Sequence, residues 1–423
     1  MKQKKLFEQF PPVTTKEWMD KINSDLKGAD FNKKLVWKTG EGFDVLPFYR
    51  KGNLKNLKHL NSGINNTGSH WLIRQNIKVA DYTAANRKAL SILMKGIDSL
   101  GFIIEDPETI NENNFTILLN GIVPDGTEIN FMPNGKAREI ISLLIKIFAE
   151  TGINKSALRG AVEADPLGKL ILNGTLCIPV EAGFDYLASL TKDTASLPNY
   201  RNLQVTGSNF TNAGAGVVQE LAFSFSMAVE YLAQLTERGI SPEEAASRMR
   251  FSFGTGSNYF MEIAKLRAAR ILWSLIANAY APADKKAFRM EIHSTTKVWN
   301  DKVEDPYINM LRTQTEAMSA ILGGADSLTV NPFDIAVDKP DEFSERIARN
   351  QQLILREEAW FDKVADPSAG SYYIENLTAL IAENSWKLFL EIENAGGFIS
   401  ALNSGFVRKQ FADFATQGIK SSL

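Results

Sequence analysis

The sequence has few of the residues from which disulfide frameworks and metal sites are built. A single cysteine, Cys177, occurs in the 423 residues, which excludes an intrachain disulfide and is typical of a reducing compartment. The three histidines, His59, His70 and His293, lie far apart and lack the HxxxH spacing of a zinc site. We therefore expect no bound metal.

The sequence also lacks an excess of one charge and a long apolar run. Lys and Arg total 47 and Asp and Glu total 49, so no overall field attracts nucleic acid or an acidic membrane. The first ten residues, MKQKKLFEQF, are basic but lack the apolar stretch of a signal peptide, and no window of about 18 residues is apolar throughout. We expect a cytoplasmic protein whose partners are small ligands or other proteins.

Residues 1–65 differ in pattern from the rest of the chain. Thr14 or Thr15 is a candidate N-cap for one short helix that ends near Gly28. We expect the remainder to form an extended arm, whose aromatic residues pack either on the chain's own body or on a partner subunit. These aromatic residues are Phe7, Phe10, Trp18, Trp37 and Phe43.

From about residue 66, short β-rich runs alternate with long amphipathic segments, which indicates a parallel sheet of the α/β class. Eight units in residues 66–397 predict a (β/α)8 TIM barrel, with a doubly wound open sheet as the alternative. We expect residues 398–423 to form a C-terminal helical extension. The predicted strands are residues 72–78, 102–105, 128–132, 158–164, 203–208, 250–254, 288–293 and 327–331.

Helical periodicity supports the segments between these strands. Leu221, Phe225 and Leu232 fall on one face of such a segment, and we assign stripes of this kind to the core. A last helix is expected to run through Glu393. Four glycines stand where helices are expected to stop and are predicted to be left-handed caps. They are Gly101, Gly152, Gly239 and Gly323.

Functional residues of such barrels follow the carboxyl ends of the strands, but the residues there match no generic motif. The run GTGSNYF at 254–260 is a weak phosphate loop, and neither GxxxxGK[ST] nor GxSxG occurs. Glu163 and Asp334 offer a glycosidase-like pair of carboxylates, although any barrel has such acids by chance. Taken alone, these residues predict a barrel without an assigned activity.

Several long motifs, in order, resemble the barrel domain of the methylmalonyl-CoA mutases over residues 71–397. The resemblance implies a barrel threaded by the pantetheine arm of coenzyme A, with adenosylcobalamin carried over its mouth by a C-terminal domain. It also implies interconversion of methylmalonyl-CoA and succinyl-CoA. The motifs are WLIRQ at 71–75, GSNFTNAGA at 207–215, NYFMEIAKLRAARILW at 258–273, HSTT at 293–296 with Trp299, RIARN at 346–350, and Asp366-Pro with GSYY at 370–373.

The residues that this resemblance marks as catalytic are exchanged. Asn76 stands where active chains have a tyrosine, and Glu163 replaces a glutamine that donates near the thioester. Asn173 aligns with the arginine expected to bind the substrate carboxylate. An amide cannot supply the charge of a bidentate guanidinium, whose hydrogen bonds contribute roughly 1.5–3 kcal/mol.

Three further positions show the same change. Asn209 replaces the histidine acid, and an amide donates no proton near neutral pH. Thr295 replaces a glutamine, and Ile335 aligns with a glutamate that faces the cofactor. The resemblance therefore implies that this chain has no catalytic residues of its own.

Two arginines of the family pattern are present, Arg74 and Arg248. They imply either the remnant of a site for the phosphates of coenzyme A or structural salt bridges. Two residues after Arg248, a serine of the pattern is Arg250, which we expect to crowd the channel.

The resemblance also bears on the cofactor and on partners. The Asp-x-His-x-x-Gly signature of the cobalamin domain does not occur in the 423 residues, and we expect no such domain after Leu423. We expect adenosylcobalamin in a partner chain and none on this one. A retained scaffold with exchanged site residues resembles the small subunit of heterodimeric mutases, a structural partner of the catalytic large subunit.

Three other interpretations are open. One is an active acyl-CoA mutase-type isomerase that uses cobalamin carried on a separate chain. Another is a barrel that binds CoA-like ligands through Arg74 and Arg248. For the isolated chain, a homodimer is the alternative assembly.

Overall fold

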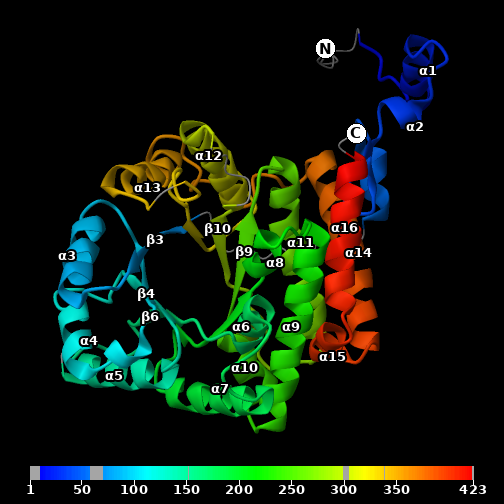
Figure 1. Ribbon diagram of the computed structural model, residues 1–423. Helices are drawn as coiled ribbons and strands as arrows, with labels where there is room; N and C mark the ends of the chain where they lie inside the picture. The colour runs from blue at the N-terminus through cyan, green and yellow to red at the C-terminus, as the bar shows by residue number, and fades with distance from the viewer. Residues whose placement is uncertain (1–9, 58–69, 151, 299–303, 338, 422–423) are drawn as a thin grey trace, which may run out of the picture.

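The structure is a computed structural model that describes residues 10–57, 70–150, 152–298, 304–337 and 339–421. The positions Phe7, His59 and Trp299 lie outside these residues. A ring of strands is surrounded by helices, with further helices along one side (Figure 1). Within the described ranges, no helix is both long and apolar enough to cross a membrane, and no group of three or more His, Cys, Asp or Glu is placed to hold a metal ion.

The strands of the ring pair in parallel, in the order β7-β6-β5-β4-β3-β11-β10-β9-β8. They are β3 (Leu72–Lys78), β4 (Ser99–Ile104), β5 (Glu128–Pro133), β6 (Arg159–Val162), β7 (Tyr200–Arg201), β8 (Leu203–Thr206), β9 (Met249–Thr255), β10 (Ile292–Thr296) and β11 (Ser327–Thr329).

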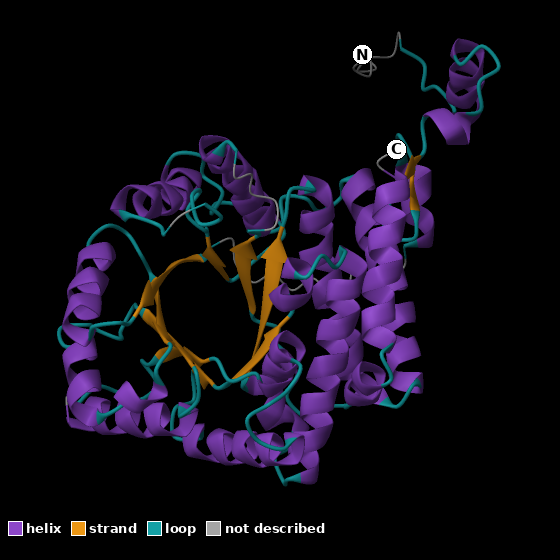
Figure 2. Ribbon diagram, viewed as in Figure 1, coloured by secondary structure: helices purple, strands orange, loops and turns teal. Residues whose placement is uncertain are grey.

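One stretch of chain closes the ring. β7 and β8 are separated only by Asn202, and β7 pairs with β6 whereas β8 pairs with β9. The N–H of Gln204 also donates to the carbonyl of Ala164, beyond β6, at 3.0 Å. Figure 2 shows the resulting barrel. The predicted (β/α)8 architecture is confirmed, and the alternative of an open doubly wound sheet is wrong.

Helices connect the strands and form the outer layer of the barrel (Figure 2). They are α3 (Tyr82–Leu93), α4 (Glu112–Leu119), α5 (Ala137–Glu150), α6 (Pro166–Asn173), α7 (Val180–Thr194), α8 (Ser208–Asn212), α9 (Val217–Glu237), α10 (Pro242–Ser247), α11 (Tyr259–Ala279), α12 (Pro306–Leu322) and α13 (Glu342–Glu357), with the short 3-10 turns η2 (Pro107–Thr109) and η3 (Lys285–Phe288).

The predicted C-terminal helical extension is present. α14 (Tyr372–Asn394) packs along α9 and α11, and α15 (Gly397–Asn403) and α16 (Phe406–Ser421) follow it on the same side of the barrel (Figure 1). Phe411 of α16 contacts the rings of Phe210 and Phe223, with centroids 6.3 and 5.7 Å away. The extension is therefore joined to the barrel through α8 and α9.

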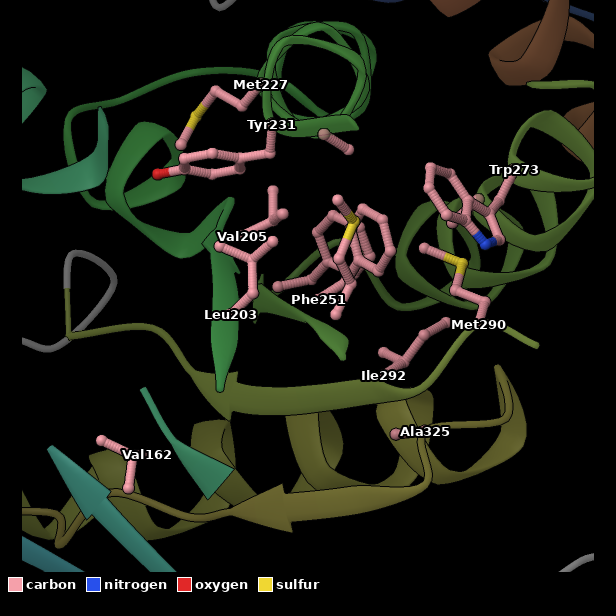
Figure 3. Close-up of a cluster of buried hydrophobic side chains, with 14 of the residues drawn as sticks. Val162, Leu203, Val205, Met227, Tyr231, Phe251, Trp273, Met290, Ile292 and Ala325 are labelled. Atoms are coloured by element: carbon pink, nitrogen blue, oxygen red, sulfur yellow. The ribbon is translucent and has the colours of Figure 1, made fainter. Parts of the chain in front are cut away.

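A large part of the core lies between the ring and the helices α9 and α11 (Figure 3). Phe251 of β9 meets the indole of Trp273 of α11 with centroids 4.8 Å apart, and Phe225 of α9 stacks on the same indole at 6.3 Å. All three side chains are buried. Truncating such a residue to alanine typically costs about 3–5 kcal/mol. The apolar stripes predicted for these helices are thus confirmed as core.

Gly101 is not a helix cap, contrary to the prediction. α3 ends at Leu93 and the chain turns at Gly96, whose φ is +88°, so β4 begins earlier than predicted. Gly101 lies inside β4, opposite Asn76 of β3. A Cβ there would collide with the side chains of Asn76 and Arg74. The glycine therefore leaves room for two interior polar side chains and does not end a helix.

Two other predictions are also wrong. Gly323 has φ −75°, and the left-handed residue after α12 is Gly324, with φ +90°. Residues 288–291 are outside the seventh strand, because Asp284 caps η3 and β10 begins only after it. Gly152 and Gly239 have φ of +69° and +80°, as predicted for left-handed caps.

The N-terminal segment begins with the predicted helix, α1 (Thr15–Asp25). The hydroxyl of Thr14 accepts from the N–H of Glu17 at 3.2 Å, and the Glu17 carboxylate accepts from the N–H of Thr14 at 2.7 Å. Neither α1 nor α2 (Phe31–Lys34) buries a side chain, and Trp18 is 47% exposed. Both helices stand away from the barrel (Figure 1).

The next part of the segment packs on the chain's own body. The hairpin of β1 (Trp37–Lys38) and β2 (Asp44–Val45) buries Phe43, and η1 (Lys51–Asn56) lies against α14. In the hairpin loop, the carboxylate of Glu41 accepts the first two N–H groups of α9, at 3.0 and 3.1 Å. The barrel and its helices thus cover Phe43, whereas Trp18 remains exposed.

Candidate functional site

The carboxyl end of the barrel interior is crossed by an ion pair. Arg74 of β3 is buried, and its Nη1 donates to Oε1 of Glu163 at 2.7 Å. Its Nε donates to Oδ1 of Asn76 at 3.0 Å, and its Nη2 lies 3.6 Å from the sulfur of Met132. Since β3 and β6 are three positions apart in the ring, the pair spans the interior. The chain's own groups therefore occupy the donors of Arg74.

A second group of charges crosses the interior nearer the amino ends of the strands. Arg250 of β9 is ion-paired with Glu128 of β5 and, at 2.5 Å, with Glu291. Its Nη1 also donates to Oδ1 of Asn130 at 2.5 Å, and Arg201 pairs with Glu291 at 2.5 Å. We call these five residues the axial cluster. It joins β5 to β9, which are several strands apart in the ring, and so crosses the barrel interior.

The charges of the axial cluster hold one another ionised. Burial alone raises the pKa of Glu291, but Arg201 and Arg250 outweigh it and lower that pKa to about 2. For Arg250, burial opposes the charged form, and Glu128 and Glu291 outweigh it, so its pKa is raised. Glu128 is supported further, because Oγ of Ser99 donates to it at 2.6 Å. The buried charges of the cluster are thus compensated.

His293 is enclosed in the same interior. Its Nδ1 lies 2.8 Å from Oγ of Ser327, and its Nε2 lies 3.2 Å from Oγ1 of Thr295. Burial first, and then the positive charges of Arg74 and Arg250, lower its pKa well below the usual value. The imidazole is therefore neutral near pH 7 and is not a proton donor of the imidazolium kind.

The structure brings together only some of the positions that the sequence marked. Asn76 and Glu163 meet through Arg74, and Thr295 meets His293. Ile335 lines a cavity with Arg74 and Asn76. Of the glycosidase-like pair, Glu163 is ion-paired with Arg74, and the pairing with Asp334 stays a prediction.

The remaining marked positions have other contacts. Asn209 of α8 approaches the carbonyl of Gly168 at 3.5 Å, and Asn173 is exposed at the end of α6. Arg248 precedes β9 at the amino end of the barrel, and its Nη1 donates to two backbone carbonyls, at 2.7 and 2.8 Å. Among the described residues Arg248 forms no ion pair, so the structural salt bridge expected for it is wrong, whereas Arg74 has one.

Sequence reasoning missed a buried ion-pair network at the carboxyl end of β9. Lys265 of α11 is ion-paired with Glu220 of α9 at 2.7 Å and with Glu262 at 2.5 Å. The two carboxylates also accept the N–H groups of Gly254 and Gly256, at 2.8 and 2.9 Å. This network attaches the end of β9 to α9 and α11. The available signal for this network was a charged residue inside an otherwise apolar helical stripe. For the axial cluster, the signal was the presence of charged residues within the strands.

Comparisons with known proteins agree with the fold. The sequence model of the methylmalonyl-CoA mutase family matches residues 109–421. The chain is 45% identical to the methylmalonyl-CoA mutase small subunit of Porphyromonas gingivalis, over 96% of this chain and 67% of that one. It is 34% identical to the methylmalonyl-CoA mutase of Cereibacter sphaeroides, over 95% and 61%. It is 30% identical to the mitochondrial methylmalonyl-CoA mutase of Homo sapiens, over 98% and 60%. The chain thus spans 60% to 67% of the length of these relatives.

Proposed function

This chain belongs to the methylmalonyl-CoA mutase family, and from that premise we propose that it is a structural small subunit without catalysis of its own. Its partner is a catalytic large subunit that interconverts methylmalonyl-CoA and succinyl-CoA. The observation that carries the proposal is the axial cluster. In the family pattern an acyl-CoA extends along the barrel axis, and here Arg250, paired with Glu128 and Glu291, crosses the barrel interior.

The cost of displacing Arg250 supports this function. Breaking a buried ion pair by removing one partner typically costs about 3–5 kcal/mol. A pantetheine arm has no cationic group to replace Arg250 as a partner for Glu128. Entry along the axis is therefore disfavoured by a factor of roughly 10²–10³ or more in affinity.

The polar groups inside the barrel and at its mouth also argue against catalysis by this chain. Arg74 is held by Glu163 and is not free to bind a substrate carboxylate. His293 is neutral and enclosed, and Asn209 carries no acidic proton. The chain thus offers neither a cationic clamp nor a proton donor at the positions where the family pattern expects them.

The described residues do not fit adenosylcobalamin either, and we assign that cofactor to the partner subunit. His293 is engaged by Ser327 and Thr295 inside the barrel, and His70 precedes β3 at the opposite end from the mouth. Ile335 presents an aliphatic side chain where the family pattern has a glutamate.

Co-expression tests the proposal. The chain is produced with a mutase large chain that retains the tyrosine, arginine and histidine of the family pattern, and the two are expected to co-purify in equal amounts. The isolated chain is titrated with methylmalonyl-CoA and succinyl-CoA by calorimetry, and no stoichiometric binding is expected. Tight ester binding, or turnover when a separate cobalamin-carrying chain is added, would support the active isomerase instead.

A further inference from the structure

A cavity of about 840 Å³ runs from the barrel mouth into the space between β3, α3 and α13. The residues that line it include Asn76, Ile335, Gln75, Lys88 and Arg349. We call it the side cavity. Its volume lies within the range of about 300–1,000 Å³ that is typical of small-molecule sites.

The polar groups in the side cavity form a chain across its wall. Nζ of Lys88 lies 2.6 Å from Oε1 of Glu345, whose Oε2 accepts from the amide of Gln75 at 3.1 Å. The carbonyl oxygen of Gln75 in turn accepts from Nη1 of Arg349 at 3.0 Å. Arg349 thus comes last in the chain, and its partner is a neutral amide.

Arg349 differs from three other cations around the cavity. Arg74 is paired with Glu163, and Lys78 and Lys88 are paired with Glu105 and Glu345. Arg349 is only 6% exposed, yet no carboxylate of a described residue forms an ion pair with it, and its buried Nε has no hydrogen-bond partner. Burial lowers its pKa. A buried guanidinium without an anionic partner is costly, and a bound anion removes that cost.

The apolar residues of the cavity lining set a second requirement for the ligand. Ile97, Ile103, Val330 and Ala348 face the cavity with apolar groups. A simple inorganic ion would leave this apolar surface uncovered, whereas an apolar body attached to the charged group would cover it.

We propose that the side cavity binds a small organic anion, a carboxylate or a phosphate ester on an apolar body, with Arg349 as its principal charged contact. The ligand enters from the barrel mouth beside Ile335. The site lies away from the axial cluster, so its occupation does not require a channel through the barrel.

Binding of simple probes to the full chain tests this site. Phenyl phosphate and benzoate distinguish the two anion types, inorganic phosphate lacks the apolar body, and benzyl alcohol lacks the charge. At least one aromatic anion is expected to raise the Tm and to bind in calorimetry. Inorganic phosphate and benzyl alcohol are expected to bind at least about tenfold more weakly, because each lacks half of the recognition.

Two variants and a matched control locate the binding. Arg349→Gln is expected to weaken the aromatic anion by about tenfold or more, and Ile335→Trp is expected to obstruct the entrance without touching the guanidinium. Arg346→Gln removes an exposed arginine from the same helix, outside the cavity, and is expected to leave the affinity unchanged.

Several outcomes overturn the proposal. One is that no aromatic anion binds at concentrations up to about 10 mM, which is weaker than a specific site of this size allows. Another is equal affinity in the wild type and in Arg349→Gln. If Arg349→Gln fails to fold, unchanged binding in Ile335→Trp is sufficient to refute the site.

Discussion

Two nearly fully buried arginines of this barrel have opposite surroundings. Arg250 in the axial cluster has two carboxylates and an amide oxygen around its guanidinium, whereas Arg349 in the side cavity has one neutral amide. The charge of Arg250 is neutralised by carboxylates of the chain itself, whereas the charge of Arg349 is available to a ligand. The contrast shows that burial alone does not reveal whether a charged residue maintains the structure or serves binding. The partners of the residue decide.

The largest expected effect comes from breaking the axial cluster. Arg250→Ser leaves Glu128 buried without its cation, and we expect a loss of about 3–5 kcal/mol in the free energy of unfolding. Urea denaturation of wild type and variant measures it. A loss below about 1 kcal/mol, typical of an exposed ion pair, would contradict the assignment of Arg250 as a buried structural charge.

The second prediction concerns the pH dependence of the stability that Glu291 contributes. The pKa of Glu291 is lowered to about 2 in the folded chain from an ordinary value of 4.5, so its stabilising contribution is complete above about pH 4.5 and is lost as the pH falls towards 2. We expect wild type to exceed Glu291→Gln in stability by about 2 kcal/mol near pH 7, with the gap closing below pH 4.5. Urea titrations at several pH values measure the gap, and a constant gap would contradict this assignment.

A double substitution separates the net contribution of the axial pair from the cost of leaving one partner alone. Arg250→Met with Glu128→Leu replaces both charges by apolar groups, and we expect a loss of about 1–2 kcal/mol, smaller than that of Arg250→Ser. The same denaturation series gives the answer. Additive losses from the two single substitutions would show that the residues act independently.

Arg349 is expected to give the smallest change. Arg349→Gln removes one hydrogen bond and an uncompensated buried charge, and these oppose each other, so we expect the stability of the ligand-free chain to change by about 1 kcal/mol or less. Differential scanning calorimetry of both proteins measures it. A loss as large as that of Arg250→Ser would place Arg349 with the structural arginines.

The order of the eight β/α units followed from the sequence, because alternating β-rich and amphipathic segments report burial directly. The ninth strand of the ring, β7, was not predicted. Local turn chemistry was less informative. Gly101 resembles a helix stop in sequence, but its place is set by the side chain of Asn76 on the neighbouring strand. Such a steric reason exists only after the strands have paired.

The contacts of the candidate site were largely beyond sequence reasoning. Arg74 and Glu163 are 89 residues apart, and Glu128 and Arg250 are 122 residues apart, so no local pattern shows that they meet. The roles of the exchanged positions rest on the resemblance to active mutases and remain predictions. For Asn173 the structure gives no additional support, since its side chain is exposed at a helix end.

The split of one stretch of chain at Asn202 gives the ring a seam. β6 and β7 are joined only through Gly160 with Tyr200 and Ala161 with Arg201, whereas β4 and β5 are paired along their whole length. Local opening costs least where the ladder is shortest, so backbone amides beside the seam should exchange with deuterium before those of β4. Circular as it looks, the barrel has a preferred place at which to come apart.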